Sequence, residues 1–384
     1  MDWNLISIIV FYTVIIAFFI KNRNKIERQG IFLLYKTKKG LNLIAKIAKK
    51  WKRFWKGFGN LAIYVGFAGI FAVLFLLAYK ALEIFMNPSP TAGVALAIPG
   101  IRIPGSPIFI PFWYGIIALI VVLLVHEGSH GLVAKAHGLK LKSAGVGLLA
   151  FLPLAFVEPD EDQLKKAPLK TKLSVFGAGP LANLATALII ILLSAVLAPI
   201  STMAFQPNGL TMVGVVNGFP AQEAGITAGD EILGVNGIQT LSIKDFSNVM
   251  DEIKPGEEVQ LMTSQGNILT KTTEDPKNKS RAYLGISFTQ DYKIKDNVYK
   301  KFGKTPWLLI YLLKLFNWIF VLNLGIGIIN LLPLGPIDGG RMVDEVLKEK
   351  MKNKKRAKKI FKTISYISLF LLLINLLGPY LMKI

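Results

Sequence analysis

The residues best suited to chemistry occur in the segment His126-Glu127-Gly128-Ser129-His130. Two histidines four residues apart lie on one face of a helix, so both imidazoles can bind a single metal ion. Glu127 then lies beside them, close to the position that water occupies in a hydrolytic zinc site. The pattern predicts zinc-dependent hydrolysis with Glu127 as the general base.

The surroundings of this segment favour a functional role. It lies within the apolar stretch Pro111–Ala134, and ionisable side chains inside a membrane helix are costly enough to indicate function. The chain has 3 histidines and no cysteine, so a metal must be held by His, Asp or Glu. The alternative is a hydrogen-bonded structural patch inside a transporter bundle.

A hydrolytic zinc ion needs a third protein ligand and an open coordination position. His137 lies about 10 Å beyond His130 along a continuous helix, which is too far for one shared ion. Asp338 is the better candidate, because it lies in the proline- and glycine-rich segment 330–340 at the end of a later apolar stretch. Its alternative role is an N-cap of the helix that begins near Arg341.

The elements that must position these residues are membrane helices. Mean hydropathy is +0.48 and 52% of the residues are hydrophobic, which is too apolar for a soluble protein. Six segments are long enough to cross a bilayer core of about 30 Å, although the first is short and a tilted or half-inserted helix is its alternative. They are Leu5–Ile20, Leu61–Met86, Pro111–Ala134, Leu173–Ile200, Leu308–Leu332 and Ile360–Leu381.

Positive charge is concentrated beside these segments. The net charge is +21, and the stretch Lys21–Lys56 contains 13 Lys and Arg against the single acid Glu27. A second basic cluster, Lys348–Lys359, precedes the last apolar segment. The positive-inside tendency and attraction to anionic lipids explain this better than nucleic-acid binding. We therefore expect an integral protein of the cell membrane with its basic loops in the cytoplasm and no nucleic-acid partner.

The same orientation places the one long polar block, Phe205–Asn297, outside the cytoplasm. Its short alternating strands and turn signals predict a folded soluble insert. The segments Gly93–Ile110 and Ser143–Val157 are apolar but too rich in Gly and Pro to span the membrane. We expect the second to be a strand-like re-entrant loop that forms part of a cleft wall.

The expected fold is a polytopic α-helical membrane protein with about six transmembrane helices and an inserted extracytoplasmic α+β domain. The expected domains are 1–57, the first span and a basic cytoplasmic or interfacial loop; 58–204, the first membrane part; 205–297, the insert; 298–345, the second membrane part; and 346–384, a basic segment and the last span. Trp51, Phe54 and Trp55 among the lysines of the first loop favour an interfacial helix, with a disordered tail as the alternative.

Three motifs together resemble the site-2 protease family of intramembrane zinc metalloproteases, which is peptidase M50-like. They are HEGSH in one span, the pattern Asn-x-x-Pro-x-x-x-x-Asp-Gly at 330–339, and the run GAGPLAN at 177–183. The resemblance implies that His126, His130 and Asp338 bind Zn²⁺ and that Glu127 is the catalytic glutamate.

The resemblance also implies that Asn330, Pro333 and Asn183 handle the substrate. Cleavage of a helix requires local unwinding, because its carbonyls are bonded to its own amides. The loop Ser143–Val157 could then hold the unwound segment by strand addition. Asn330 could bond the exposed backbone.

The insert resembles a PDZ domain, most specifically at Gly229-Asp230 and in the strand that follows. The later segment Arg281–Ile286 looks like the peptide-binding loop of circularly permuted PDZ domains attached to proteases. Gly285 and Ile286 are the residues there that would bind a peptide end. A groove that only excludes bulk is the alternative.

The expected function is intramembrane endopeptidase activity on membrane proteins with a transmembrane segment, after prior trimming, in regulated intramembrane proteolysis. The PDZ-like domain would bind or filter the trimmed ends, and anionic lipids would lie near the basic loops. The alternatives are a catalytically inactive membrane scaffold that binds peptides through the PDZ-like domain, and a metal transporter. A transporter would predict neither Glu127 in the base position nor a PDZ-like insert.

Overall fold

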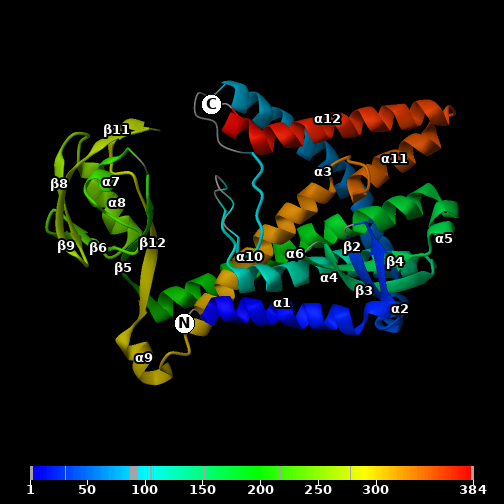
Figure 1. Ribbon diagram of the computed structural model, residues 1–384, viewed down its shortest axis with the longest axis horizontal. Helices are drawn as coiled ribbons and strands as arrows, with labels where there is room; N and C mark the ends of the chain where they lie inside the picture. Colours follow the sequence, from blue (N-terminus) through cyan, green and yellow to red (C-terminus); the bar gives the residue numbers. More distant parts are fainter. Residues whose placement is uncertain are drawn as a thin grey trace. The chain divides into compact units, whose positions relative to one another are not determined.

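The computed structural model describes residues 3–381 except 31, 87–92, 102, 104, 105, 107, 150, 151, 217 and 277 (Figure 1). The chain divides into two compact units. One consists of Met1–Ser194 and Leu313–Ile384, and the other of Ala195–Leu312, so the end of α6 (Leu169–Ala204) and the start of α10 (Trp307–Asn330) belong to the second unit. Each is described separately. Parts of the predicted segments Gly93–Ile110 and Ser143–Val157, and Asn217 of the insert, lie outside the described residues.

The first unit is built on long apolar helices. The elements are α1 (Trp3–Lys21), a short 3-10 turn (Arg23–Lys25), α2 (Leu41–Lys50), α3 (Lys52–Met86), α4 (Phe112–Ala136), α5 (Glu161–Lys166), α6 (Leu169–Ala204), α10 (Trp307–Asn330), α11 (Asp338–Lys350) and α12 (Lys354–Leu381). Of the described helices, α3, α4, α6, α10 and α12 are long and apolar enough to cross a membrane. The predicted first span forms α1, whose described apolar stretch Leu5–Lys21 is shorter than those five.

Close packing among these helices relies on small residues, as is usual where helices meet in a bilayer. An added Cβ at Gly66 of α3 would lie 2.6 Å from Met342 of α11, and one at Gly69 would lie 2.4 Å from Leu331. The outward face of α3 instead carries exposed aromatic side chains such as Phe71 and Phe75. The glycines thus allow α3 to pack closely against the segment that carries Asp338, while the opposite face of α3 suits contact with lipid.

A four-stranded antiparallel sheet lies beside these helices. Its order is β1 (Ile26–Gln29), β2 (Phe32–Thr37), β3 (Leu141–Leu149) and β4 (Leu152–Pro159). The last two strands are the predicted re-entrant segment. The first two were not predicted: they lie in the stretch expected to be a basic loop, and β2 pairs along its whole length with β3.

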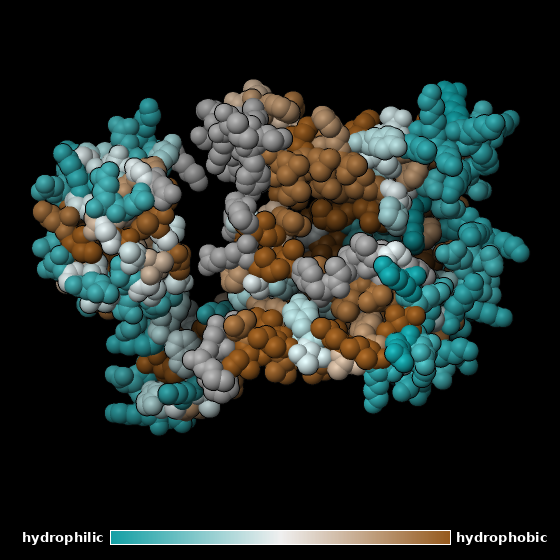
Figure 2. Space-filling view, viewed as in Figure 1, coloured by the Kyte–Doolittle hydropathy of each residue, from teal (hydrophilic) through white to brown (hydrophobic). Residues whose placement is uncertain are grey.

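Hydrophilic side chains collect at one end of this unit. Figures 1 and 2 show them where α2, α5 and α11 lie, while apolar side chains cover the sides of the long helices. The helix α2 is amphipathic and ends on Lys49 and Lys50, and α11 ends on Lys348 and Lys350. The chain turns at Trp51 before α3 begins, so the expected interfacial helix stops short of Phe54 and Trp55.

The second unit is an α+β fold. Its elements are β5 (Phe205–Val215), α7 (Pro220–Glu223), β6 (Glu231–Val235), β7 (Ile238–Gln239), α8 (Ile243–Glu252), β8 (Glu258–Thr263), β9 (Gly266–Lys271), β10 (Thr273–Asp275), β11 (Asn278–Tyr283), β12 (Ile286–Ile294) and α9 (Asp296–Phe302). The main sheet has the order β12-β5-β6-β8-β9, with β7 paired to β6. Its core includes Leu210, Ile232, Val235 and Leu261, all fully buried.

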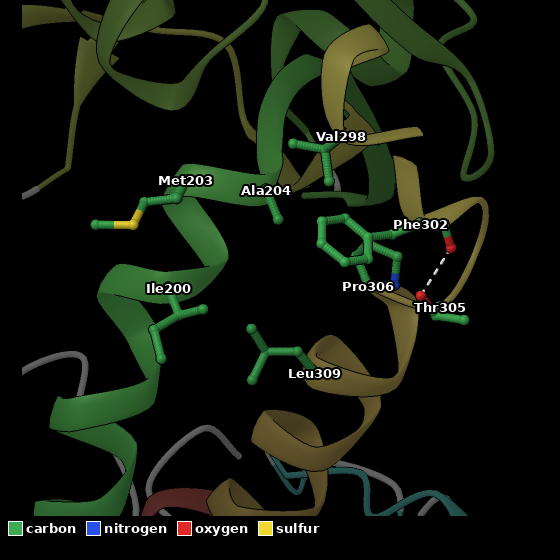
Figure 3. A pocket seen from close by; sticks show the side chains of 8 residues that line it. All are labelled: Ile200, Met203, Ala204, Val298, Phe302, Thr305, Pro306 and Leu309. Carbon is green, nitrogen blue, oxygen red and sulfur yellow. Dashed lines mark hydrogen bonds between the residues drawn. The ribbon is translucent and has the colours of Figure 1, made fainter. Parts of the chain in front are cut away.

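A cavity of about 360 Å³ lies within the second unit, where α6 ends and α9 leads into α10 (Figure 3). Apolar groups from Ile200, Met203, Phe302 and Leu309 form most of its wall. The hydroxyl of Thr305 also lines it, but donates to the carbonyl of Phe302 at 2.7 Å. This lining offers neither a metal ligand nor an activated nucleophile.

Candidate metal centre

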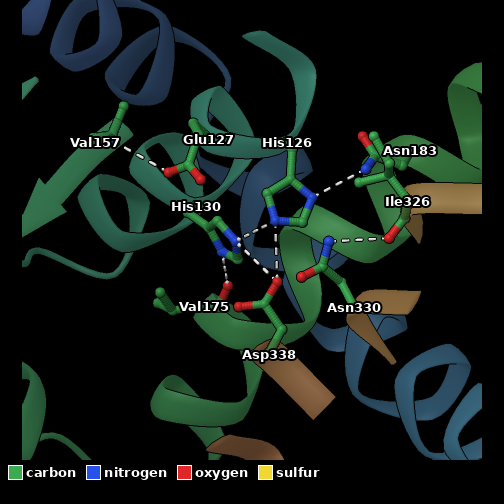
Figure 4. A network of polar contacts seen from close by, with 9 residues as sticks. All are labelled: His126, Glu127, His130, Val157, Val175, Asn183, Ile326, Asn330 and Asp338. Carbon is green, nitrogen blue, oxygen red and sulfur yellow. Dashed lines mark hydrogen bonds and ion pairs between the residues drawn. The ribbon is translucent and has the colours of Figure 1, made fainter. Parts of the chain in front are cut away.

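Two imidazoles meet a carboxylate in the core of the first unit (Figure 4). His126 and His130 lie one turn apart on α4 and are 7% and 9% exposed. Their Nε2 atoms are 3.2 Å apart. The Oδ2 atom of Asp338 lies 3.1 Å from Nε2 of His126 and 3.3 Å from Nε2 of His130. The structure therefore brings together the three residues predicted to bind metal.

Asp338 reaches this position because the chain turns sharply after α10. It is the first residue of α11, and the N-cap of that helix is Ile337. The turn requires glycine, since an added Cβ at Gly339 or Gly340 would lie 2.4 or 2.0 Å from backbone carbonyl oxygens of the preceding segment. The carboxylate of Asp338 thus faces both imidazoles, which suits a metal ligand.

The donor set fits zinc. A tetrahedral zinc ion with bonds of about 2.0–2.1 Å to nitrogen and oxygen separates its ligand atoms by about 3.3 Å. The three distances observed between the ligand atoms of His126, His130 and Asp338 lie at 3.1–3.3 Å. The Nδ1 atom of His130 is 2.6 Å from the carbonyl oxygen of Val175, which can only accept. This bond places the proton on Nδ1 and leaves Nε2 free for a metal.

Gly179 allows α6 to approach these ligands. A Cβ at this position would lie 2.4 Å from Nε2 of His130 and 2.7 Å from Nε2 of His126. Any side chain there would therefore occupy the space of the metal-binding nitrogens. The run at 177–183 was recognised in the sequence as a motif, but this function of Gly179 was not predicted.

Glu127 lies on α4 between the two histidines and contacts the sheet. Its Oε2 atom accepts a hydrogen bond from the backbone N–H of Val157 in β4, at 3.2 Å. The predicted general base is thus held at the junction of α4 and β4 and is half-buried. The strand contact was not predicted, because it depends on how β4 packs against α4.

The residues predicted to handle substrate divide into two groups. Asn183 and Asn330 lie at the metal centre (Figure 4). The amide nitrogen of Asn183 is 3.0 Å from Nδ1 of His126, and that of Asn330 donates to the carbonyl of Ile326 at 2.9 Å. Pro333 is buried instead, and its carbonyl accepts from Ser365 of α12 at 3.1 Å.

Gly285 and Ile286 belong to the second unit, at the start of β12. Gly285 has a φ of 76°, a left-handed conformation that favours glycine. Its carbonyl accepts from the amide of Val216 at 2.7 Å, so the loop is fixed to the residue that directly follows β5.

His137 is separate from the metal ligands, as expected from its spacing. It forms the C-cap of α4, and its Nε2 atom is buried without a hydrogen-bond partner among the described residues. Burial, followed by the positive charges of Lys56, Lys170 and Lys52, lowers its pKa. Both effects favour the neutral form of His137.

Comparison with known proteins places the chain in a family. The sequence profile of peptidase family M50 matches residues 114–375, which contain all four predicted catalytic and metal-binding residues. An uncharacterized protein of Methanocaldococcus jannaschii is 30% identical over 326 residues, covering 84% of this chain and 80% of that protein.

Two further relatives have more informative names. A putative zinc metalloprotease of Clostridium perfringens is 31% identical over 201 residues, covering 46% of this chain and 58% of that protein. A membrane-bound transcription factor site-2 protease homolog of Arabidopsis thaliana is 26% identical over 195 residues, covering 50% of this chain and 36% of that protein.

Proposed function

The chain belongs to peptidase family M50, a family of metalloproteases, and from this premise we propose that it cleaves transmembrane segments of other membrane proteins within the bilayer. The observation that carries the proposal is the convergence of His126, His130 and Asp338 among long apolar helices. A protease whose metal centre lies among such helices acts on a peptide bond that is brought to the same depth in the membrane. We propose prior trimming of the substrate, as in regulated intramembrane proteolysis.

The chemistry divides between the metal and Glu127. His126, His130 and Asp338 would hold a zinc ion, which when bound would supply Lewis-acid polarisation of the scissile carbonyl and of water. Glu127 accepts a proton from the attacking water as the carbon–oxygen bond forms. The same carboxyl group then delivers that proton to the leaving amine as the carbon–nitrogen bond breaks. Its contact with β4 keeps this carboxylate from rotating away from the two imidazoles.

The edge of β4 is a suitable place for an unwound substrate. In an antiparallel pair, alternate residues turn their backbone groups away from the partner strand. The N–H of Val157 points to Glu127 and therefore away from β3. Ala155 lies two residues earlier in β4, so its backbone N–H and C=O also point away from β3. Pro153 has no N–H, which is typical of an edge strand. A substrate strand would thus pair with Ala155 next to the catalytic glutamate.

Replacing Ala155 by Pro should lower kcat/KM for a transmembrane substrate about fivefold, because one backbone hydrogen bond of about 1 kcal/mol is lost. The matched change Ala155→Val keeps the N–H and should have a smaller effect. Both are measured by cleavage of a purified single-span substrate in detergent. Equal rates in the two variants would contradict strand addition at this edge.

For the second unit we propose a PDZ-like domain on the extracytoplasmic side that acts chiefly as a size filter. Its candidate groove between α8 and β12 is narrowed by its own side chains. Arg281 pairs with Asp251 at 2.8 Å, the rings of Phe246 and Phe288 are 5.1 Å apart, and Gln290 accepts from the first amide of α8 at 2.8 Å. A groove bridged by these contacts favours a domain that excludes bulky substrates over one that binds a peptide tightly.

The proposed orientation puts the basic loops in the cytoplasm next to anionic lipids. The lysines of α2 and the Lys and Arg residues that begin α12 lie at the same end of the first unit (Figure 1), which supports a single basic side. Because the chain has no cysteine, one cysteine introduced on the exposed surface of the insert reports its side. Labelling of intact cells by an impermeant maleimide is expected, and protection would contradict the orientation.

The experiment that tests the function is cleavage of a single-span substrate by the purified protein. Cleavage should stop on chelation and return on addition of zinc. A substrate that keeps a bulky folded extracytoplasmic domain should be cleaved at least about tenfold more slowly than its trimmed form. A zinc-loaded protein that cleaves no trimmed substrate would favour the alternative, an inactive scaffold.

A further inference from the structure

Asn183 of α6 is the side chain that contacts the metal centre on the side away from Asp338. It is fully buried, and its amide nitrogen lies 3.0 Å from Nδ1 of His126. The same imidazole directs its other nitrogen, Nε2, toward Asp338 and His130 (Figure 4). Asn183 is therefore placed behind a metal ligand and contacts it through the nitrogen that does not bind metal.

The two histidines have partners of different kinds at Nδ1. His130 faces the carbonyl of Val175, which can only accept, so its tautomer is fixed by the backbone. His126 faces an amide, which can either donate or accept. Only one of these two arrangements is compatible with a metal on Nε2, because a neutral imidazole that binds through Nε2 carries its proton on Nδ1.

Metal binding by His126 therefore requires the amide of Asn183 to present its oxygen. In the structure the amide nitrogen faces Nδ1, and Oδ1 is buried without a hydrogen-bond partner among the described residues. A half-turn about the terminal bond of Asn183 exchanges the two atoms, and no other described bond to Oδ1 is broken. The rotated amide then accepts from Nδ1–H of His126.

We propose that Asn183 is a positioning residue that selects the metal-binding tautomer of His126 and fixes the direction of its ring. This differs from a role in substrate handling, which the family resemblance implied. The inference rests on the proposed function only in requiring that the centre binds zinc.

The test compares two substitutions of similar size. Asn183→Asp keeps an oxygen that accepts from Nδ1–H, whereas Asn183→Leu removes every polar atom. Loss of a hydrogen bond behind a metal ligand typically weakens metal binding about 10–100-fold. We expect that loss in Asn183→Leu, with Asn183→Asp remaining within about threefold of the unsubstituted protein. Zinc affinity is measured by competition with a chromophoric chelator, and the visible spectrum of the cobalt-substituted protein reports ligand geometry.

A matched control is available in α10. Asn323 is also fully buried, and its amide donates to the carbonyl of Ile319 at 2.8 Å, as an i−4 contact. Asn323→Leu should leave zinc affinity unchanged. The proposal is overturned if Asn183→Leu binds zinc as tightly as the unsubstituted protein, if Asn183→Asp loses as much affinity as Asn183→Leu, or if Asn323→Leu loses as much. Absence of zinc binding by the unsubstituted protein would instead contradict the proposed function.

Discussion

Replacing Glu127 by Gln should lower kcat/KM by about 10²–10⁴-fold while zinc stays bound at the level of the unsubstituted protein. Gln has nearly the same shape as Glu and can still accept from the amide of Val157, so the α4–β4 contact is kept. It cannot take a proton from water. The loss should therefore appear in catalysis, because Glu127 lies outside the group of three side chains that surrounds the metal position.

The measurement is single-turnover cleavage of a trimmed single-span substrate, together with zinc content after chelator-free purification. The control is Glu161→Gln on α5, which removes the same charge at a side chain that is 70% exposed. That variant should cleave at the rate of the unsubstituted protein. Retained cleavage in Glu127→Gln would contradict the general-base role, and loss of zinc would show that Glu127 supports the ligands.

The parts of the site that follow from helical periodicity could be predicted from the sequence. His126 and His130 share a face because they are one turn apart, and ionisable residues in an apolar span predict function. Asp338 is distant in the chain and was predicted from the break in its segment and from the family resemblance. The structure brings it to 3.1 Å from His126. Its alternative role as an N-cap is wrong, since Ile337 caps α11.

The strands β1 and β2 could not be predicted in the same way. They lie within a stretch where Lys and Arg dominate, and that composition indicates a cytoplasmic loop. Their pairing partner β3 lies more than a hundred residues further along the chain. A strand whose partner is so distant in the chain has little signal in its own sequence. What favours β2 is its pairing with the edge of β3, which the local residues do not reveal.

Contacts between crossing helices could not be predicted from the sequence either. The roles of Gly179 and Asn183 depend on where α6 crosses α4, and helix crossing is not encoded in the spacing of either segment. One signal was present: two glycines and a proline within five residues of an otherwise apolar helix, 177–181, which indicate close approach of a neighbouring element. That signal identifies the helix but not the ligand that it approaches.

Gly179 therefore gives the second large expected effect. Gly179→Ala should weaken zinc binding by at least about 100-fold, because the added Cβ would lie 2.4 Å from Nε2 of His130. Either α6 moves away or the imidazole rotates, and both separate the three ligand atoms. Cleavage should fall with zinc content, which distinguishes this variant from Glu127→Gln.

The control is Gly128→Ala, which makes the same chemical change within the metal-binding segment itself. An added Cβ at Gly128 meets no atom within 4 Å, so zinc affinity should stay within about twofold of the unsubstituted protein, since outer contacts of the ligands are kept. Sequence motif alone would rank Gly128 above Gly179, whereas the crossing of α6 over α4 ranks them the other way. Equal zinc affinity in the two variants, measured by chelator competition, would mean that α6 does not approach the ligands as closely as the structure shows.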